Sequence, residues 1–294
     1  MTGTVYVDKF ITYLKETKGS SLNTVSAYER DLSAFCEYIS VLPIDILEIS
    51  PEHLDKYKKT LVNKGFSVSS VSRAMSSLRG FYKYLLVNGF INDNPSKSIK
   101  NDKVEKKSFE ILSASEIDIL LAQPDTKCIK GIRDKAMLEI MYATGMKVSE
   151  LITLDTSDLN IQLGFVICRS NKRERTIFLY PAAIKCLKNY IENSRKYLSD
   201  GSENALFLNV NGSRMTRQGL WKILKGYVSD AGITKTITPH TFRHSFATHL
   251  LENGADINDI KEILGHSDIA STQVYANYLK SKVKDSYLKF HPRA

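Results

Sequence analysis

Apolar residues recur at the spacing of an α-helix through the first hundred residues. The first stripe comprises Tyr28, Leu32, Phe35 and Ile39. It predicts a helix capped by Asn23 or Thr24, because either side chain can accept a hydrogen bond from a free amide of the first turn. A second helix is predicted to begin at Ser50 and to end at Gly65. Its apolar face would comprise Leu54, Tyr57 and Leu61.

A third helix is predicted after the serine-rich turn at residues 67–70. Its apolar face would comprise Val71, Met75, Leu78, Tyr82 and Leu85. Three basic residues, Arg73, Arg79 and Lys83, lie elsewhere on the same helix. They form either a solvated face or a face that contacts DNA phosphates, and we expect the second because basic helices are typical of DNA clamps.

A polar, lysine-rich segment separates this helical region from the rest of the chain. It follows Pro95, contains few large apolar residues and is typical of a linker between domains. We therefore expect an N-terminal domain over residues 1–100, a linker over 101–112 and a C-terminal domain over 113–294. The second domain should open with a capping box, because its first residues read SASE.

The second domain is predicted to be mainly helical, with one β-hairpin. Helical patterns cover residues 114–122, 131–143, 181–198, 216–231, 240–252, 257–264 and 268–279. Two short apolar segments, GFVICRS and RTIFLYP, flank a polar turn at 171–173 and predict two strands. The expected fold class is thus mainly α, with an N-terminal helical bundle and an α-rich second domain that contains a small β-hairpin.

The net charge of the chain indicates the kind of partner that it binds. Lys and Arg number 41 and Asp and Glu 32, which gives a formal charge of +9 and favours a polyanion such as nucleic acid. Residues 1–9 lack the pattern of a signal peptide, and no apolar run is long enough to span a bilayer. We therefore expect a cytoplasmic protein without a membrane partner.

The cysteines indicate no metal site. Cys36, Cys128, Cys168 and Cys186 are far apart and form no CxxC pair, a spacing that fits neither a zinc site nor a disulfide framework. We expect buried or partly buried free thiols, and neither a metal nor a cofactor.

The strongest chemical signal lies between residues 239 and 278. His240 and Arg243 are three residues apart and share one face of a helix. His266 follows a glycine placed to end the next helix, and Tyr275 comes nine residues later. Each residue alone would most often be structural, but together they could converge from three successive elements.

These side chains suit attack on a phosphodiester. An Arg fork matches two phosphate oxygens, and His can donate to a phosphate oxygen or move a proton near neutral pH. A Tyr hydroxyl has an ordinary pKa of about 10 and needs an electropositive site to act as a nucleophile. The expected products are a phosphotyrosine and a free hydroxyl, with the transition-state charge stabilised by Arg, Lys and His instead of Mg²⁺.

The pattern resembles the tyrosine recombinases, and in particular their bacterial Xer type. The shared motif is H-x-x-R, then G-H at the end of a helix, then Y nine residues on. Other agreeing segments are YERDL at 28–32, RDKAMLEIMYATG at 133–145, VSEL at 148–151, MTRQ at 215–218 and the terminal HPRA. The likeness therefore covers nearly the whole chain.

The resemblance implies a SAM-like, core-binding N-terminal domain that clamps DNA, and a C-terminal catalytic domain. It implies that Tyr275 is the nucleophile and that His240 and Arg243 contact the scissile phosphate. His266 would assist as a phosphate donor or proton carrier. Glu150 would hold the neighbouring segment, whereas the remaining histidines of this region, His244 and His249, are expected to be structural.

The resemblance also implies the partners. These are double-stranded DNA with short sites that resemble inverted repeats, and a homo- or hetero-tetramer on two such sites in which each protomer passes its C-terminal helix to a neighbour. Further DNA contacts are expected from Thr216, Arg217 and Gln218. Chromosome dimer resolution, inversion and integration remain alternative roles.

The sequence departs from the recombinase pattern at two places. The segment ATGMKVSEL has Lys147 where the first active-site arginine is usual, and Lys keeps the charge but not the two-pronged fork. The hairpin turn reads RSNKRER, in which Lys172 is our choice for the general acid. Lys147 leaves a second hypothesis open, namely a DNA-binding paralogue with weak or no catalysis that acts architecturally.

Overall fold

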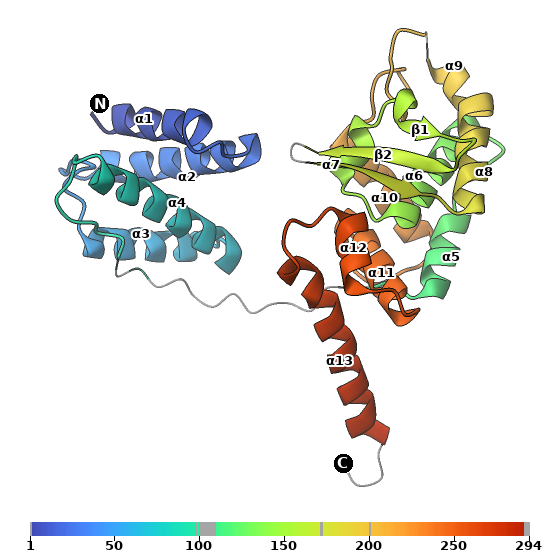
Figure 1. Cartoon of the computed structure of the whole chain (residues 1–294). Coiled ribbons are helices and arrows are strands. Elements are labelled where there is room, and N and C mark those ends of the chain that lie inside the picture. Colours follow the sequence, from blue (N-terminus) through green and yellow to red (C-terminus); the bar gives the residue numbers. More distant parts are fainter. Residues whose placement is uncertain (1, 98, 100–109, 171–172, 200, 291–294) are drawn as a thin grey trace. The chain divides into compact units, whose positions relative to one another are not determined.

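The computed structural model describes residues 2–97, 99, 110–170, 173–199 and 201–290, which divide into two units, Met1–Lys106 and Lys107–Ala294 (Figure 1). Each unit has a hydrophobic core of its own. A search of the described helices finds none long and apolar enough to cross a membrane.

The described part of the first unit is helical. Its helices are α1 Thr2–Glu16, α2 Leu22–Ser40, α3 Pro51–Asn63 and α4 Val68–Val87. Ser50 begins α3 as predicted, and Ser67 alone caps α4 by accepting from the amide of Ser70 at 3.2 Å. The cap predicted for α2 was wrong: Ser21, in an extended conformation, accepts from the amide of Thr24 at 3.2 Å. Helix α2 therefore starts earlier than its apolar stripe indicates.

Aromatic side chains fill the core of this unit. Helix α1, which the sequence reading did not predict, inserts Phe10 with its ring centroid 5.6 Å from that of Phe81 on α4. Helix α2 places Phe35 at 5.0 Å from Tyr57 on α3. The apolar face predicted for α4 is buried, and Tyr82 within it donates its hydroxyl to the Ile46 carbonyl at 3.1 Å.

An ion pair with a buried carboxylate joins α2 to α4. The Asp31 carboxylate, 8% exposed, accepts from Arg73 at 2.8 and 3.2 Å and from the Ser77 hydroxyl at 2.8 Å. Arg73 is thus engaged within the unit, but its side chain is 52% exposed, so its contact with DNA stays a prediction. Arg79 and Lys83, four residues apart on α4, are the other predicted DNA contacts of this unit.

The second unit combines helices with a small sheet. Its elements are α5 Ala114–Ala122, α6 Ile129–Thr144, α7 Val148–Thr153, β1 Leu159–Asn160, β2 Phe165–Ser170, β3 Arg173–Phe178, α8 Pro181–Tyr190, α9 Lys196–Leu198, α10 Arg217–Asp230, α11 Pro239–Glu252, α12 Ile257–Leu264 and α13 Ala270–Phe290. The strands are antiparallel in the order β1-β2-β3, with Phe165 opposite Phe178 and Ser170 opposite Arg173. Helix α7, strand β1 and a 3-10 helix over Thr156–Asp158 were not predicted. A π-helical turn, Ile191–Arg195, interrupts the helix expected over 181–198.

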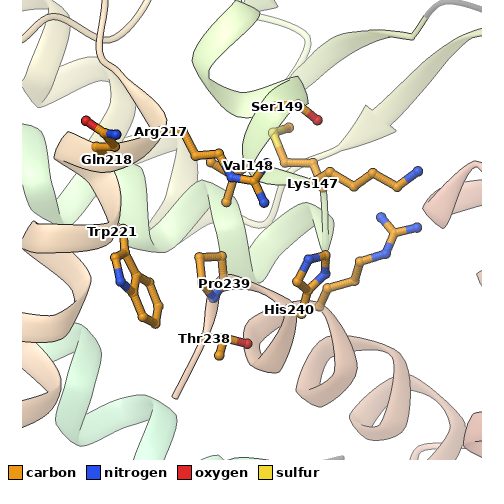
Figure 2. Close-up of a pocket in the computed structure, with 11 residues that line it drawn as sticks. Lys147, Val148, Ser149, Arg217, Gln218, Trp221, Thr238, Pro239 and His240 are labelled. Carbon is orange, nitrogen blue, oxygen red and sulfur yellow. The ribbon is translucent and has the colours of Figure 1, made fainter. Parts of the chain in front are cut away.

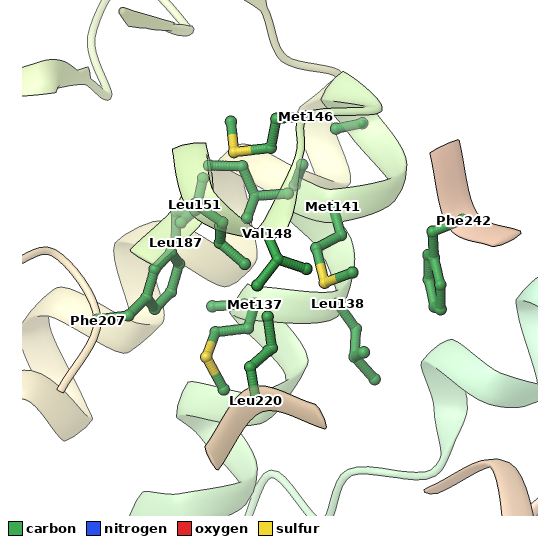
Figure 3. Close-up of a cluster of buried hydrophobic side chains, with 14 of the residues drawn as sticks. Met137, Leu138, Met141, Met146, Val148, Leu151, Leu187, Phe207, Leu220 and Phe242 are labelled. Carbon is green, nitrogen blue, oxygen red and sulfur yellow. The ribbon is translucent and has the colours of Figure 1, made fainter. Parts of the chain in front are cut away.

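The core of the second unit surrounds α6. Figure 3 shows Met137 and Met141 of α6 near Val148 of α7, with Leu220 of α10 and Phe242 of α11 in the same cluster. Burying such side chains contributes about 1.5–3 kcal/mol each. This packing holds the C-terminal end of α6 beside α11, and the candidate site lies there.

The capping box at the start of the second unit is confirmed, because Ser113 and Glu116 each accept from the other's amide. The predicted linker, in contrast, extends too far. Leu112 is fully buried, and its amide donates to Ser245 Oγ at 2.9 Å. Residues 101–109 of that linker lie outside the described residues.

The cysteines are free thiols. Cys168 is buried and Cys36 and Cys186 are partly buried, as expected, but Cys128 is exposed. Its sulfur lies at the N-terminus of α6, where it accepts from the amide of Gly131 at 3.3 Å. The sulfur thereby satisfies one of the amides that have no partner within the helix.

Candidate active site

Helix α11 carries three side chains of the candidate site. Thr238 caps it by accepting from the amide three residues on at 3.3 Å, and Pro239 follows at the first helical position, where an amide would have no helical partner. His240 lies in the first turn, and Arg243 and His244 follow in the next. The local sequence therefore sets the first residue of α11, and with it the turn of the helix on which each of these side chains lies.

Arg243 is held by the ends of two other helices. Its side chain, on a residue 4% exposed, donates to the Gly145 carbonyl at 2.8 Å and to the Leu264 carbonyl at 2.7 Å. These carbonyls end α6 and α12, and helix C-termini carry partial negative charge that favours a cation. Gly145 has φ +57°, and a Cβ there would lie 2.4 Å from Phe246, so glycine is required for α6 to end against α11.

A buried ion pair supports the segment that carries Lys147. Glu150 accepts two hydrogen bonds from Arg175 of β3, at 2.9 and 3.1 Å, and one from the Lys147 amide at 2.8 Å. Burial alone would raise the pKa of Glu150, but these hydrogen bonds lower it below its usual value. Arg175 also donates to the Ile263 carbonyl at 2.7 Å. Glu150 therefore connects the start of α7 to β3, and Arg175 connects β3 to α12, an arrangement that fits the holding role expected of Glu150.

Tyr275 lies on α13 with its hydroxyl against α11. The residue is 2% exposed, and its hydroxyl oxygen is 3.0 Å from Nδ1 of His244. Burial raises the pKa of Tyr275, whereas the charge and hydrogen bond of Arg243 act to lower it. The phenol is thus next to both the arginine and the second histidine of α11.

His266 follows α12 and faces the same positive charges. Its Nδ1 is 2.8 Å from Oγ1 of Thr272, which is fully buried. Burial, followed by the charges of Arg243 and Lys147, lowers the pKa of His266 to about 4. The ring is therefore neutral at pH 7 and can donate through one of its nitrogens only.

A pocket of about 520 Å³ opens beside these residues. Figure 2 shows Lys147, Arg217 and His240 around it, with Trp221 of α10 on its wall. Burial and then the charges of Arg217, Arg243 and Lys147 lower the pKa of His240. None of the described residues that line the pocket is an Asp or Glu. Such a site favours an anion and matches the phosphate of a diester.

The structure brings some predicted residues to this pocket and not others. Arg217 and Gln218 line it, whereas Thr216 caps α10 by accepting from the amide of Gly219 at 3.0 Å. Lys172 lies outside the described residues. Among those described, no three His, Cys, Asp or Glu residues are grouped as a metal site would require.

Three residues of this region were not predicted to take part in the site. His244 was expected to be structural, although it lies four residues after His240, a spacing that puts both on one helix face. Arg175 is inside a predicted strand, and three of the six residues of that strand, RERTIF, are charged, so its charge alone does not single it out. Trp221 lies four residues after Arg217, so helical periodicity could have placed both on one face. His249, expected to be structural, pairs with the Tyr142 hydroxyl at 2.8 Å.

Comparisons with known protein families match most of the chain. The phage integrase family matches residues 110–282, and the N-terminal SAM-like domain of phage integrases matches residues 7–89. Tyrosine recombinase XerD of Oceanobacillus iheyensis is 44% identical over 294 residues, with 98% of each chain covered. The XerD of Listeria innocua is 42% identical over 300 residues, covering 98% of this chain and 99% of its own.

Solved structures share the fold. The XerA recombinase is 27% identical with a TM-score of 0.55, covering 99% of this chain and 100% of its own. The XerH site-specific recombinase, bound to a palindromic difH substrate in a post-cleavage complex, is 22% identical with a TM-score of 0.78. That match covers 95% of this chain and 83% of the other. These comparisons give no support to the architectural alternative.

Proposed function

Since the chain belongs to the phage integrase family and is a site-specific tyrosine recombinase of the Xer type, we propose a mechanism for it. We propose that it cleaves and rejoins double-stranded DNA through a 3′-phosphotyrosine at Tyr275. The observation that carries the proposal is the contact of a buried tyrosine hydroxyl with Arg243, beside an electropositive pocket. Because its substrate is DNA, we propose that it acts in the cytoplasm.

The proposed reaction assigns a task to each charged group. Arg243 and His240 donate to the two non-bridging oxygens of the scissile phosphate, and His266 donates to one of the same oxygens. The Tyr275 oxygen bonds to phosphorus as the bond to the 5′ oxygen breaks, and Lys172 supplies the proton that this oxygen takes up. The phosphotyrosine retains the energy of the broken bond, so rejoining needs no ATP.

A suicide substrate tests this proposal. A library of random-sequence duplexes, each nicked in one strand so that the short cleaved end diffuses away, is incubated with the protein, and the covalently attached DNA is sequenced. We expect one enriched sequence and a protein–DNA adduct stable in denaturant. A protein that binds this library without ever forming an adduct would not be the proposed enzyme.

We expect Lys147→Arg to raise the cleavage rate. Lys147 is exposed on the pocket wall, so the larger guanidinium fits without being buried, and it adds a second oxygen contact to the phosphate. A charge-assisted hydrogen bond of about 1.5–3 kcal/mol corresponds to about 10- to 150-fold in rate. Single-turnover adduct formation on the selected duplex measures this change.

The control for Lys147 is Lys147→Met, which keeps the length but removes the charge and should slow cleavage. A cleavage rate unchanged in both variants would place Lys147 outside the phosphate site. A slower Arg variant would mean that the pocket is adapted to lysine.

We further propose that the protein acts as a tetramer on two DNA sites and that each protomer passes its C-terminal helix to a neighbour. Figure 1 shows the C-terminal half of α13 running away from the rest of its unit, and apolar residues recur at helical spacing in its sequence through residue 290. A helix that extends from its own unit in this way can dock on another copy, and repeated head-to-tail docking closes a ring.

Removing residues 281–294 should therefore impair pairing of two sites but not binding to one. Tyr275 precedes the deleted segment on the same helix, so the order in which protomers cleave should also change. Mobility shifts on duplexes with one and with two selected sites measure both effects. Normal two-site complexes together with normal recombination by the shortened protein would contradict helix exchange.

A further inference from the structure

The hydrogen-bonding capacity of three groups indicates where the proton of Tyr275 lies. Arginine only donates, whereas a tyrosine hydroxyl carries one hydrogen and also accepts. Arg243 hydrogen-bonds to the Tyr275 side chain, so the phenolic oxygen is the acceptor of that bond. The hydroxyl can then donate its hydrogen to Nδ1 of His244, which is 3.0 Å away. In this arrangement Nδ1 is unprotonated and the ring proton is on Nε2.

The surroundings of His244 keep its ring ready to accept. Burial, followed by the charges of His240 and Arg243, lowers the pKa of His244 to about 4. The ring is therefore neutral at pH 7. Its centroid is 5.6 Å from that of Tyr275 and 6.4 Å from that of His240, so His244 touches the nucleophile while His240 lines the pocket.

We propose that His244 is the group that accepts the proton of Tyr275 during DNA cleavage. As the phenolic oxygen bonds to phosphorus, its O–H bond breaks and the proton passes to Nδ1 of His244. The bond to the 5′ oxygen breaks at the same time, and that oxygen takes its proton from the general acid. Rejoining reverses both transfers, and His244 returns the proton to Tyr275.

The bound phosphate makes this transfer easier. Arg243 and His240 oppose a positive charge on His244 in the free protein. A phosphate held by these two residues brings negative charge to the same place, and a nearby anion raises the pKa of a histidine. His244 is thus a poor proton acceptor before DNA binds and a better one when the scissile phosphate is present, so the nucleophile is not activated without its substrate.

This inference rests on the proposed function, so its test uses the full-length protein and the selected nicked duplex. We expect His244→Ala to bind this duplex normally and to form adduct about 10²–10⁴-fold more slowly, the usual contribution of a general base. Added imidazole should raise the adduct rate of His244→Ala at least about tenfold, because it can occupy the space left by the ring. His244→Asn places an oxygen near the position of Nδ1 without a basic nitrogen; it should keep the fold and remain slow with imidazole.

A second substrate separates the two proton transfers. A duplex with sulfur in place of the 5′ bridging oxygen has a leaving group that needs no proton. It should restore the rate of adduct formation in Lys172→Ala, the matched control for the general acid. It should not restore that rate in the His244 variants. The proposal would be overturned by a near-normal adduct rate in folded His244→Asn or by no response of His244→Ala to imidazole. It would also be overturned if the sulfur-containing duplex restored the adduct rate of either variant. Absence of adduct with the unaltered protein would instead overturn the proposed function.

Discussion

Tyr275→Phe should abolish the covalent protein–DNA adduct and leave the affinity for DNA unchanged. The change removes only the hydroxyl that attacks phosphorus, and the ring keeps its buried position. The buried hydroxyl also contacts His244 and Arg243, so the free energy of unfolding should fall by about 1 kcal/mol. Denaturing gels of the reaction on the selected duplex measure the adduct, and mobility shifts measure binding.

Tyr278→Phe is the matched control. It removes a hydroxyl from the same helix, three residues on and only partly buried, and should form adduct at the normal rate. Adduct formed by the Tyr275 variant at an undiminished rate would mean that another residue is the nucleophile. Loss of DNA binding in that variant would mean instead that the tyrosine holds α13 in place.

DNA affinity should fall by about 10³–10⁵-fold between 50 and 200 mM salt. This is the loss expected when six to ten phosphates are neutralised and their counterions released, and the formal charge of +9 supports such contacts. Arg79→Ala and Lys83→Ala should each weaken binding and reduce the salt slope by about one. Equilibrium binding to the selected duplex over a salt series gives both quantities.

The ion pairs of Arg73 and Lys97 decide which variants can test DNA contact by the first unit. Arg73→Ala would leave the Asp31 carboxylate buried without its cation and so destabilise the first unit, which makes it unsuitable as a test of DNA contact. Lys97→Ala removes the same charge from an exposed pair with Asp93 and is the control for net charge. A flat salt dependence, or equal effects of Lys97→Ala and Arg79→Ala, would contradict a DNA-binding face on α4.

Local sequence predicted most helices because their signals are local. Ser113 and Ser50 begin helices where capping rules place them, and the stripe from Val71 to Leu85 faces the core. The misses have physical reasons as well. Helix α7 is six residues long, less than two turns, so no periodicity develops. Helix α1 has apolar residues at helical spacing over residues 7–14, but this stripe covers only about two turns, which gives a weak periodic signal.

Local sequence patterns indicate the kinds of residue in the candidate site and the elements that carry them. Spacing put His240 and Arg243 on one helix face and Tyr275 on a later helix, since the rise and period of a helix follow from backbone geometry alone. The packing of distant elements, in contrast, places Arg243 against the ends of α6 and α12, pairs Glu150 with Arg175, and brings the Tyr275 hydroxyl to His244. Those contacts join residues 21 to 98 positions apart, and no local preference encodes them. They exist because the buried faces of α6, α11 and α13 pack in one way. Close packing of these faces sets which side chains of different helices touch one another.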